Sequence, residues 1–63
     1  MQRGDTIRVV GDQGKELVRR LVEVRGQVVL ICTEDEFQAA HTEGREPVCV
    51  GFKANKVVGV VTI

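Results

Sequence analysis

The side chains in this chain that could do chemistry are two cysteines and one histidine: Cys32, His41 and Cys49. Their spacing matches no zinc-binding pattern, and a structural zinc site would need a fourth ligand. A catalytic pair of Cys32 and His41 would need an electropositive setting to form the thiolate, whereas the acidic residues that follow Cys32 would raise its pKa. We therefore expect no metal, no cofactor and no catalytic residue, and interpret both cysteines as small buried side chains.

The acidic run at residues 34–36 has a structural explanation. Thr33 followed three residues later by Glu36 fits a capping box, and carboxylates are favoured at a helix N-terminus. Gly44 is typical of the residue that ends a helix. The pattern predicts a short α-helix at residues 34–43, docked over an open end of a sheet by Phe37 and Ala40.

Three arginines form the one patch that suggests a polyanion. Arg19, Arg20 and Arg25 could contact backbone phosphates, and Arg19 and Arg25 point the same way along a strand unless a β-bulge intervenes. The alternative is a solvated face that pairs with Glu16 and Glu23. No aromatic stacking platform accompanies the arginines, and nine basic residues balance nine acidic ones. Weak nucleic-acid binding is therefore the alternative function rather than the favoured one.

A long ribbon at residues 16–33 carries these arginines. Two runs of β-branched side chains meet at Arg25-Gly26, which predicts a β-hairpin with these two residues as its loop. The opposed pairs would then be Val24 with Gln27, Val22 with Val29, and Arg20 with Ile31. One face would carry the expected core side chains Val22, Val24, Val29 and Ile31.

The opposite face of this ribbon is too apolar for a plain solvent face. It would carry Leu21, Val28 and Leu30, which need a cover from a curled sheet, from the helix or from another molecule. We take these three residues as the possible interaction surface. The alternation breaks at Arg19-Arg20, where a bulge would restore it and bend the strand.

The rest of the chain predicts three more strands. Thr6 to Val10 form the first, residues 48–52 follow Pro47, and residues 57–63 form the last, after a tight or 3₁₀ connector at residues 53–56. The expected order is β-β-β-α-β-β. All 63 residues are expected to form one small domain.

Two segments resemble SH3-like small barrels of the KOW and Tudor kind. They are the GDxIxV motif at residues 4–9 with its glycine-bearing turn, and GFKANKV at residues 51–57, which is similar to the 3₁₀ connector before the last strand. The resemblance implies a mainly β, five-stranded barrel; an OB-fold, which also places a helix after its third strand, is the alternative. SH3 grooves and Tudor cages are built from aromatic side chains, and only Phe37 and Phe52 are present, so no binding residues carry over.

These observations favour a non-catalytic interaction module. Its expected partner is another protein or a second copy of the chain, because a 63-residue monomer would struggle to cover so many apolar side chains. No apolar run is long enough to span a membrane. Two cysteines without an export signal suggest a cytoplasmic protein with reduced thiols.

Overall fold

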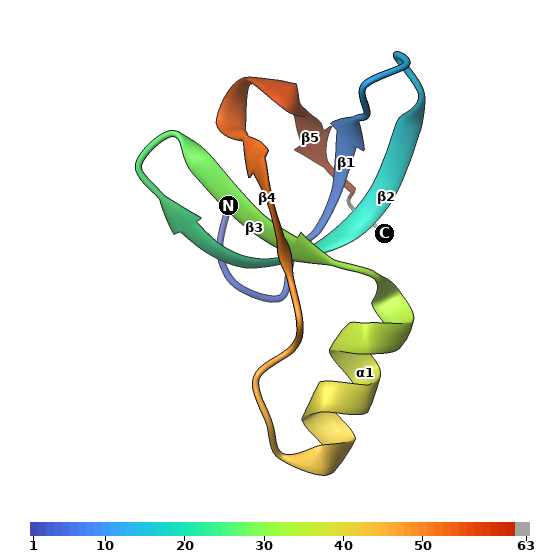
Figure 1. Cartoon of the computed structure of the whole chain (residues 1–63), viewed down its shortest axis with the longest axis vertical. Coiled ribbons are helices and arrows are strands. Elements are labelled where there is room, and N and C mark those ends of the chain that lie inside the picture. Colours follow the sequence, from blue (N-terminus) through green and yellow to red (C-terminus); the bar gives the residue numbers. More distant parts are fainter. Residues whose placement is uncertain (62–63) are drawn as a thin grey trace.

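The computed structural model describes residues 1–61 and contains one antiparallel sheet with one short α-helix (Figure 1). Its elements are β1 (Thr6–Val10), β2 (Glu16–Arg25), β3 (Val28–Cys32), α1 (Glu34–Glu43), β4 (Val50–Lys53), the 3₁₀ helix η1 (Ala54–Lys56) and β5 (Val57–Val60). The predicted order of elements is confirmed. The strands lie in the order β4-β3-β2-β1-β5, and no ladder between β4 and β5 closes the sheet within the described residues.

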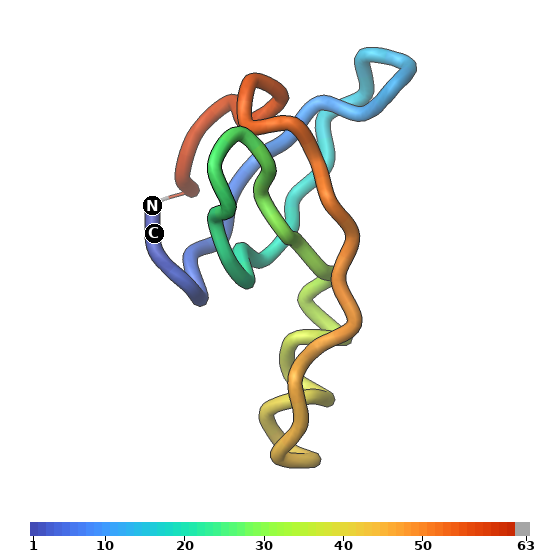
Figure 2. Tube along the Cα trace, turned by 60° about the vertical axis from the view of Figure 1, so that its left-hand side comes forward, coloured from blue at the N-terminus to red at the C-terminus, as the bar shows by residue number. Residues whose placement is uncertain are grey.

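The sheet curls around a small aliphatic core. Its fully buried side chains are contributed by the three central strands: Ile7, Val9, Leu21, Val29 and Ile31. Leu17, Phe52, Ala54 and Val57 pack against them, so η1 and both outer strands close over the same core. Helix η1 links the end of β4 to the start of β5 in three residues. The two outer strands therefore come close together at this end of the sheet without pairing (Figure 2).

The hairpin between β2 and β3 turns one residue later than the sequence predicted. Arg25 pairs with Val28 and Val24 with Val29, so the loop is Gly26-Gln27 rather than Arg25-Gly26. Gly26 has a φ of 58°, and Gln27 is not among the residues with positive φ. A positive φ at the first loop residue alone is the type II′ arrangement, which requires glycine there.

The predicted bulge lies in β2 but two residues further on. The pairing of β1 with β2 is regular through Arg19 and Arg20, whereas the pairing with β3 shifts between Leu21 and Glu23. Leu21 and Val22 are therefore both buried, although they are adjacent in a strand. A bulge inserts one residue and thereby reverses the faces of the residues beyond it.

This shift corrects the predicted faces of the ribbon. Val29 and Ile31 are core residues, as expected, and Val22 is buried. Leu21 was predicted on the opposite face and instead lies fully buried in the core. Val24 pairs with Val29 and so keeps the predicted core-facing side, but its side chain is 46% exposed near the hairpin tip rather than buried in the core.

Local signals placed the helix correctly. Helix α1 spans Glu34–Glu43, Thr33 Oγ1 accepts a hydrogen bond from the Glu36 amide at 3.1 Å, and Gly44 ends the helix with a φ of 66°. Ala40 is buried, whereas Phe37 is half-buried. The helix and the segment that returns from it extend from one end of the sheet (Figure 1).

The last two strands are shorter than expected. Strand β4 begins at Val50 rather than at Val48 and extends to Lys53, and the 3₁₀ connector is confirmed as η1. Strand β5 ends at Val60, although the Val61 amide still donates to the Thr6 carbonyl at 2.8 Å. The predicted strand ran to Ile63, and residues 62 and 63 lie outside the described part of the chain.

Val24 and Val29 pair directly across the hairpin, and substitutions at both test which of the two side chains is buried. Val29→Ala should lower the free energy of unfolding by about 2 kcal/mol, because it removes buried methyl groups and leaves a cavity. Val24→Ala should cost less than about 1 kcal/mol, because the Val24 side chain is already half in solvent. Urea unfolding of both variants measures the difference, and equal costs would contradict the burial of Val29 opposite an exposed Val24.

Candidate functional site

The three predicted phosphate-binding arginines do not form one patch. Arg19 pairs with Ile7, so it lies on the core-facing side of the sheet, whereas Arg25 pairs with Val28 beyond the bulge and lies on the other side. The Arg19 guanidinium donates from Nη1 to the Val18 carbonyl at 2.8 Å. Arg25 forms an ion pair with Glu23. The condition under which Arg19 and Arg25 would point the same way, an unbulged ribbon, is not met.

Arg20 has a structural role that the sequence did not reveal. Its Nε donates to the Gly4 carbonyl at 2.9 Å, and its Nη1 lies 2.9 Å from both carboxylate oxygens of Glu34. The guanidinium carbon lies 4.2 Å from the centre of the Phe37 ring. Arg20 thus joins the N-terminal segment, the centre of β2 and the first turn of α1. Hydrogen bonds from Gln38 and from Arg20 hold the pKa of Glu34 below its ordinary value.

A second charged cluster fixes the segment between α1 and β4. The Glu36 carboxylate accepts from Arg45 Nη1 at 2.6 Å and from the Val48 amide at 2.8 Å. These bonds, that of Arg45 first, lower the pKa of Glu36. The capping box is therefore only half formed, because the Glu36 side chain serves this segment while Thr33 caps the helix. Arg45 also donates to Glu43 at 2.8 Å.

The two cysteines and the histidine do not form a recognisable catalytic arrangement. Cys32 is buried at the end of β3, Cys49 is half-buried one residue before β4, and both are free thiols. His41 is exposed on α1. Across residues 1–61, no group of three or more potential ligands is placed to hold a metal ion.

The most distinctive surface is the free edge of β4. Val48 and Val50 are 75% and 58% exposed. Within the described residues β4 pairs only with β3, so its other edge presents unpaired backbone groups. We define the β4 edge as residues 48–53. Residues 47–52 contain no charged side chain, and Lys53 follows them.

Two of the three residues in the predicted interaction surface lie on β3, across β4 from its free edge and on the face opposite Val50. Val28 pairs with Lys53, and Leu30 pairs with Gly51 on the same face. A Cβ atom added at Gly51 would lie 3.3 Å from Val28 Cγ1, so the Val28 side chain leans over this glycine. Val28 is exposed and Leu30 half-buried. Leu21 is excluded from this surface by its burial in the core.

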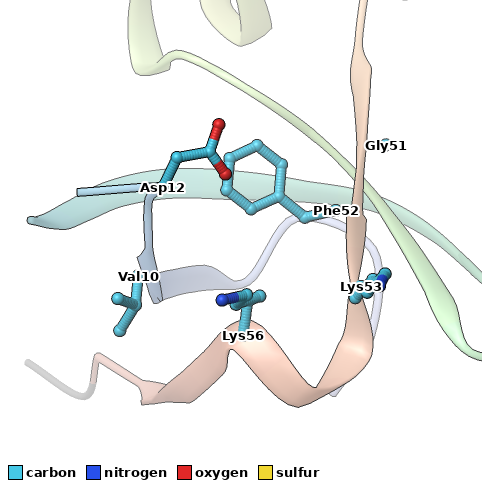
Figure 3. A pocket seen from close by; sticks show the side chains of 6 residues that line it. All are labelled: Val10, Asp12, Gly51, Phe52, Lys53 and Lys56. Carbon is cyan, nitrogen blue, oxygen red and sulfur yellow. The ribbon is translucent and has the colours of Figure 1, made fainter. Parts of the chain in front are cut away.

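A shallow hollow of about 440 Å³ opens beside β4 (Figure 3). It is lined by Val10, Asp12, Gly51, Phe52, Lys53 and Lys56. Figure 3 shows residues from the end of β1, from β4 and from η1 meeting around it. The lining offers two ammonium groups, one carboxylate and one aromatic ring, and it includes no nucleophile with a base.

Comparisons with known proteins leave the site to be interpreted from its own geometry. Neither protein-family models, curated proteins nor solved structures gave a match to this chain. In the part of the chain that the structure describes, no helix is both long and apolar enough to cross a membrane.

The contacts of Arg20 predict that its planar guanidinium is needed for stability. Arg20→Lys should lower the free energy of unfolding by about 1–2 kcal/mol, because an ammonium group cannot reproduce the hydrogen bonds to Gly4 and Glu34 together with the ring contact. Arg25→Lys, at an exposed ion pair, should change it by less than about 0.5 kcal/mol. Urea unfolding measures both, and equal effects would argue against the Arg20 contacts.

The Glu36 cluster predicts a dependence of stability on pH. Because the pKa of Glu36 is lower in the folded state than its ordinary value of 4.5, its contribution is present above that value and is lost as the pH falls through the folded pKa. Glu36→Gln should therefore be less stable than wild type at pH 7, and the difference should shrink below pH 4.5.

Thermal unfolding at several pH values checks this expectation. Glu16→Gln is the control, because that carboxylate makes only an exposed contact of 3.5 Å with Arg8. If the difference in melting temperature between Glu36→Gln and wild type stays constant down to the acid transition, the link between Glu36 ionisation and stability is refuted.

Proposed function

We propose that this chain is a non-catalytic, self-associating interaction module in which the β4 edge pairs with the same edge of a second copy. The observation that carries the proposal is the exposure of Val48 and Val50, 75% and 58%, beside unpaired backbone of an edge strand. An exposed apolar edge is a template for addition of another strand.

The two edges of the sheet differ in how well they are protected. Folded proteins blunt edges with charges, proline or bulges. Strand β5 carries a bulge in its pairing with β1, between Arg8 and Val9, whereas the ladder between β3 and β4 is regular. Strand β5 also lacks charge, so the regular ladder beside β4, rather than its charge, makes the β4 edge the better candidate for pairing.

The charge pattern favours a second copy as the occupant. The segment runs from Glu46, which pairs with Arg3 at 3.1 Å and has an 80% exposed side chain, to Lys53. In an antiparallel pair related by a two-fold axis, the basic end of each β4 edge lies toward the acidic end of the other. Val48 and Val50 of the two chains would then share one face and shield each other from solvent.

The amount of exposed surface also supports association. The accessible surface is 4477 Å², compared with about 4000 Å² for a compact monomer of this mass. Seven valines and Met1 are among the exposed large apolar side chains of the described residues. Covering part of this area would add burial that the small core cannot supply.

At the level of fold, the proposal includes an SH3-like barrel that is not fully closed. Sequential pairing of β1 to β4, with β5 returning to β1, supports this choice over the Greek-key order of an OB-fold. The 3₁₀ turn at Ala54–Lys56 supports it too. Two free cysteines fit a cytoplasmic location.

The alternative function, weak nucleic-acid binding, gains no support from the arginines. Arg20 and Arg25 are paired with carboxylates, and Arg19 lies on the other side of the sheet from Arg25. The charge available for phosphate contacts is therefore divided and partly neutralised.

Sedimentation equilibrium at micromolar concentration tests self-association. The wild-type chain should approach twice the monomer mass of 6.9 kDa, and Val50→Lys should shift it to the monomer by placing a charge at the edge. Val18→Lys is the matched control, because Val18 is similarly exposed but lies on β2. A wild-type monomer at all concentrations, or equal dissociation by both variants, would overturn the proposal.

A further inference from the structure

Cys32 and Cys49 lie opposite each other at the end of the β3 and β4 pairing. The ladder joins Val28 to Lys53 and continues in strict register to Ile31 and Val50. One further step in the same register places Cys32 opposite Cys49. Directly opposed residues of an antiparallel pair have Cα atoms about 4.5–5.5 Å apart, which lies within the range of about 4.4–6.8 Å that a disulfide spans.

Two further observations support this juxtaposition. Both cysteines are free thiols, so neither is committed to another partner within the described residues. The neighbouring Cys49 also contributes to the raised pKa of Cys32, after burial and the Glu36 carboxylate. Such an interaction between the two sulfur groups requires them to be close in space.

We propose that Cys32 and Cys49 form a reversible cross-strand disulfide, oxidised by small-molecule disulfides such as oxidised glutathione. This modification site is independent of the proposed self-association. Pairing at the β4 edge extends the sheet sideways and leaves its faces open, so Cys49 stays accessible in either oligomeric state.

The exchange proceeds in two balanced steps. Cys49 is the more exposed thiol. As a thiolate, it attacks one sulfur of the small disulfide. This attack forms a mixed disulfide on Cys49 and releases one small thiolate. Cys32 then loses its proton to solvent and attacks the Cys49 sulfur, which forms the internal S–S bond and releases the second small thiol. Two protein thiols are oxidised by two electrons, and the small disulfide is reduced to two thiols.

The bond would secure the part of the chain that the sheet holds least. It closes a loop at residues 33–48, which contains α1 and the segment held by Glu36. The ladder stops at Val50, so the disulfide adds one covalent pair beyond the last hydrogen-bonded one. Cross-linking a loop of this size stabilises a fold mainly by restricting the unfolded chain.

Oxidation of the reduced, folded chain in glutathione buffers tests the proposal. The main product should be a single covalent chain about 2 Da lighter that no longer reacts with an alkylating agent, and dithiothreitol should restore both thiols. The melting temperature of the oxidised form should rise by roughly 10 °C or more. Cys32→Ser should stop at the mixed disulfide on Cys49, because the second thiol is missing.

A register control separates this geometry from the mere presence of two thiols. The double variant Cys49→Ser with Val48→Cys keeps two cysteines but moves one to the opposite face of the strand. It should form the internal disulfide at least about tenfold more slowly than wild type. Equal rates, a wild-type product that is mainly glutathionylated on both cysteines, or thiols that stay reactive would each overturn the proposal.

Discussion

The bulge in β2 is the constraint on which the rest of the structure depends. The first half of this ten-residue strand pairs with β1 and the second half with β3, so one strand must serve two directions of the curled sheet. The shift between Leu21 and Glu23 allows two adjacent apolar side chains to be buried and reverses the faces beyond them. Without it, Leu21 would leave the core and Arg25 would lie on the same side as Arg19.

Charged side chains do structural work around this bend. The core of the sheet is small, and α1 offers mainly Ala40 and Phe37 for packing. Exposed ion pairs contribute little one at a time, but Arg20 and Glu36 each bond a backbone group as well as a charged partner. Each therefore links a helix turn to a distant segment. The Glu36 bonds in particular determine how the chain enters β4.

The β4 segment joins the two proposals of function and modification. Its edge presents valines to a possible partner, whereas one of its faces carries Cys49 beside Cys32. Alternation of side chains in a strand keeps these features apart, since Val48 and Val50 point to one face and Cys49 to the other. Strand β4 is a short edge strand that pairs with β3 alone within the described residues.

The sequence by itself determined the features that depend on neighbouring residues. Thr33 and Gly44 set the limits of α1, and the alternation of residues 6–10 set β1, because caps and side-chain periodicity act over a few residues. Only the tertiary structure decided the hairpin register, the site of the bulge and the partners of Arg20 and Glu36. A shift of one residue exchanges the two faces of a strand, and that choice is made by packing against strands and helices distant in sequence. The exposed β4 edge was not predicted from the sequence, because it emerged only from the assembled sheet. Of the predicted surface, Leu21 belongs to the core, and Val28 and Leu30 lie on the face opposite Val50.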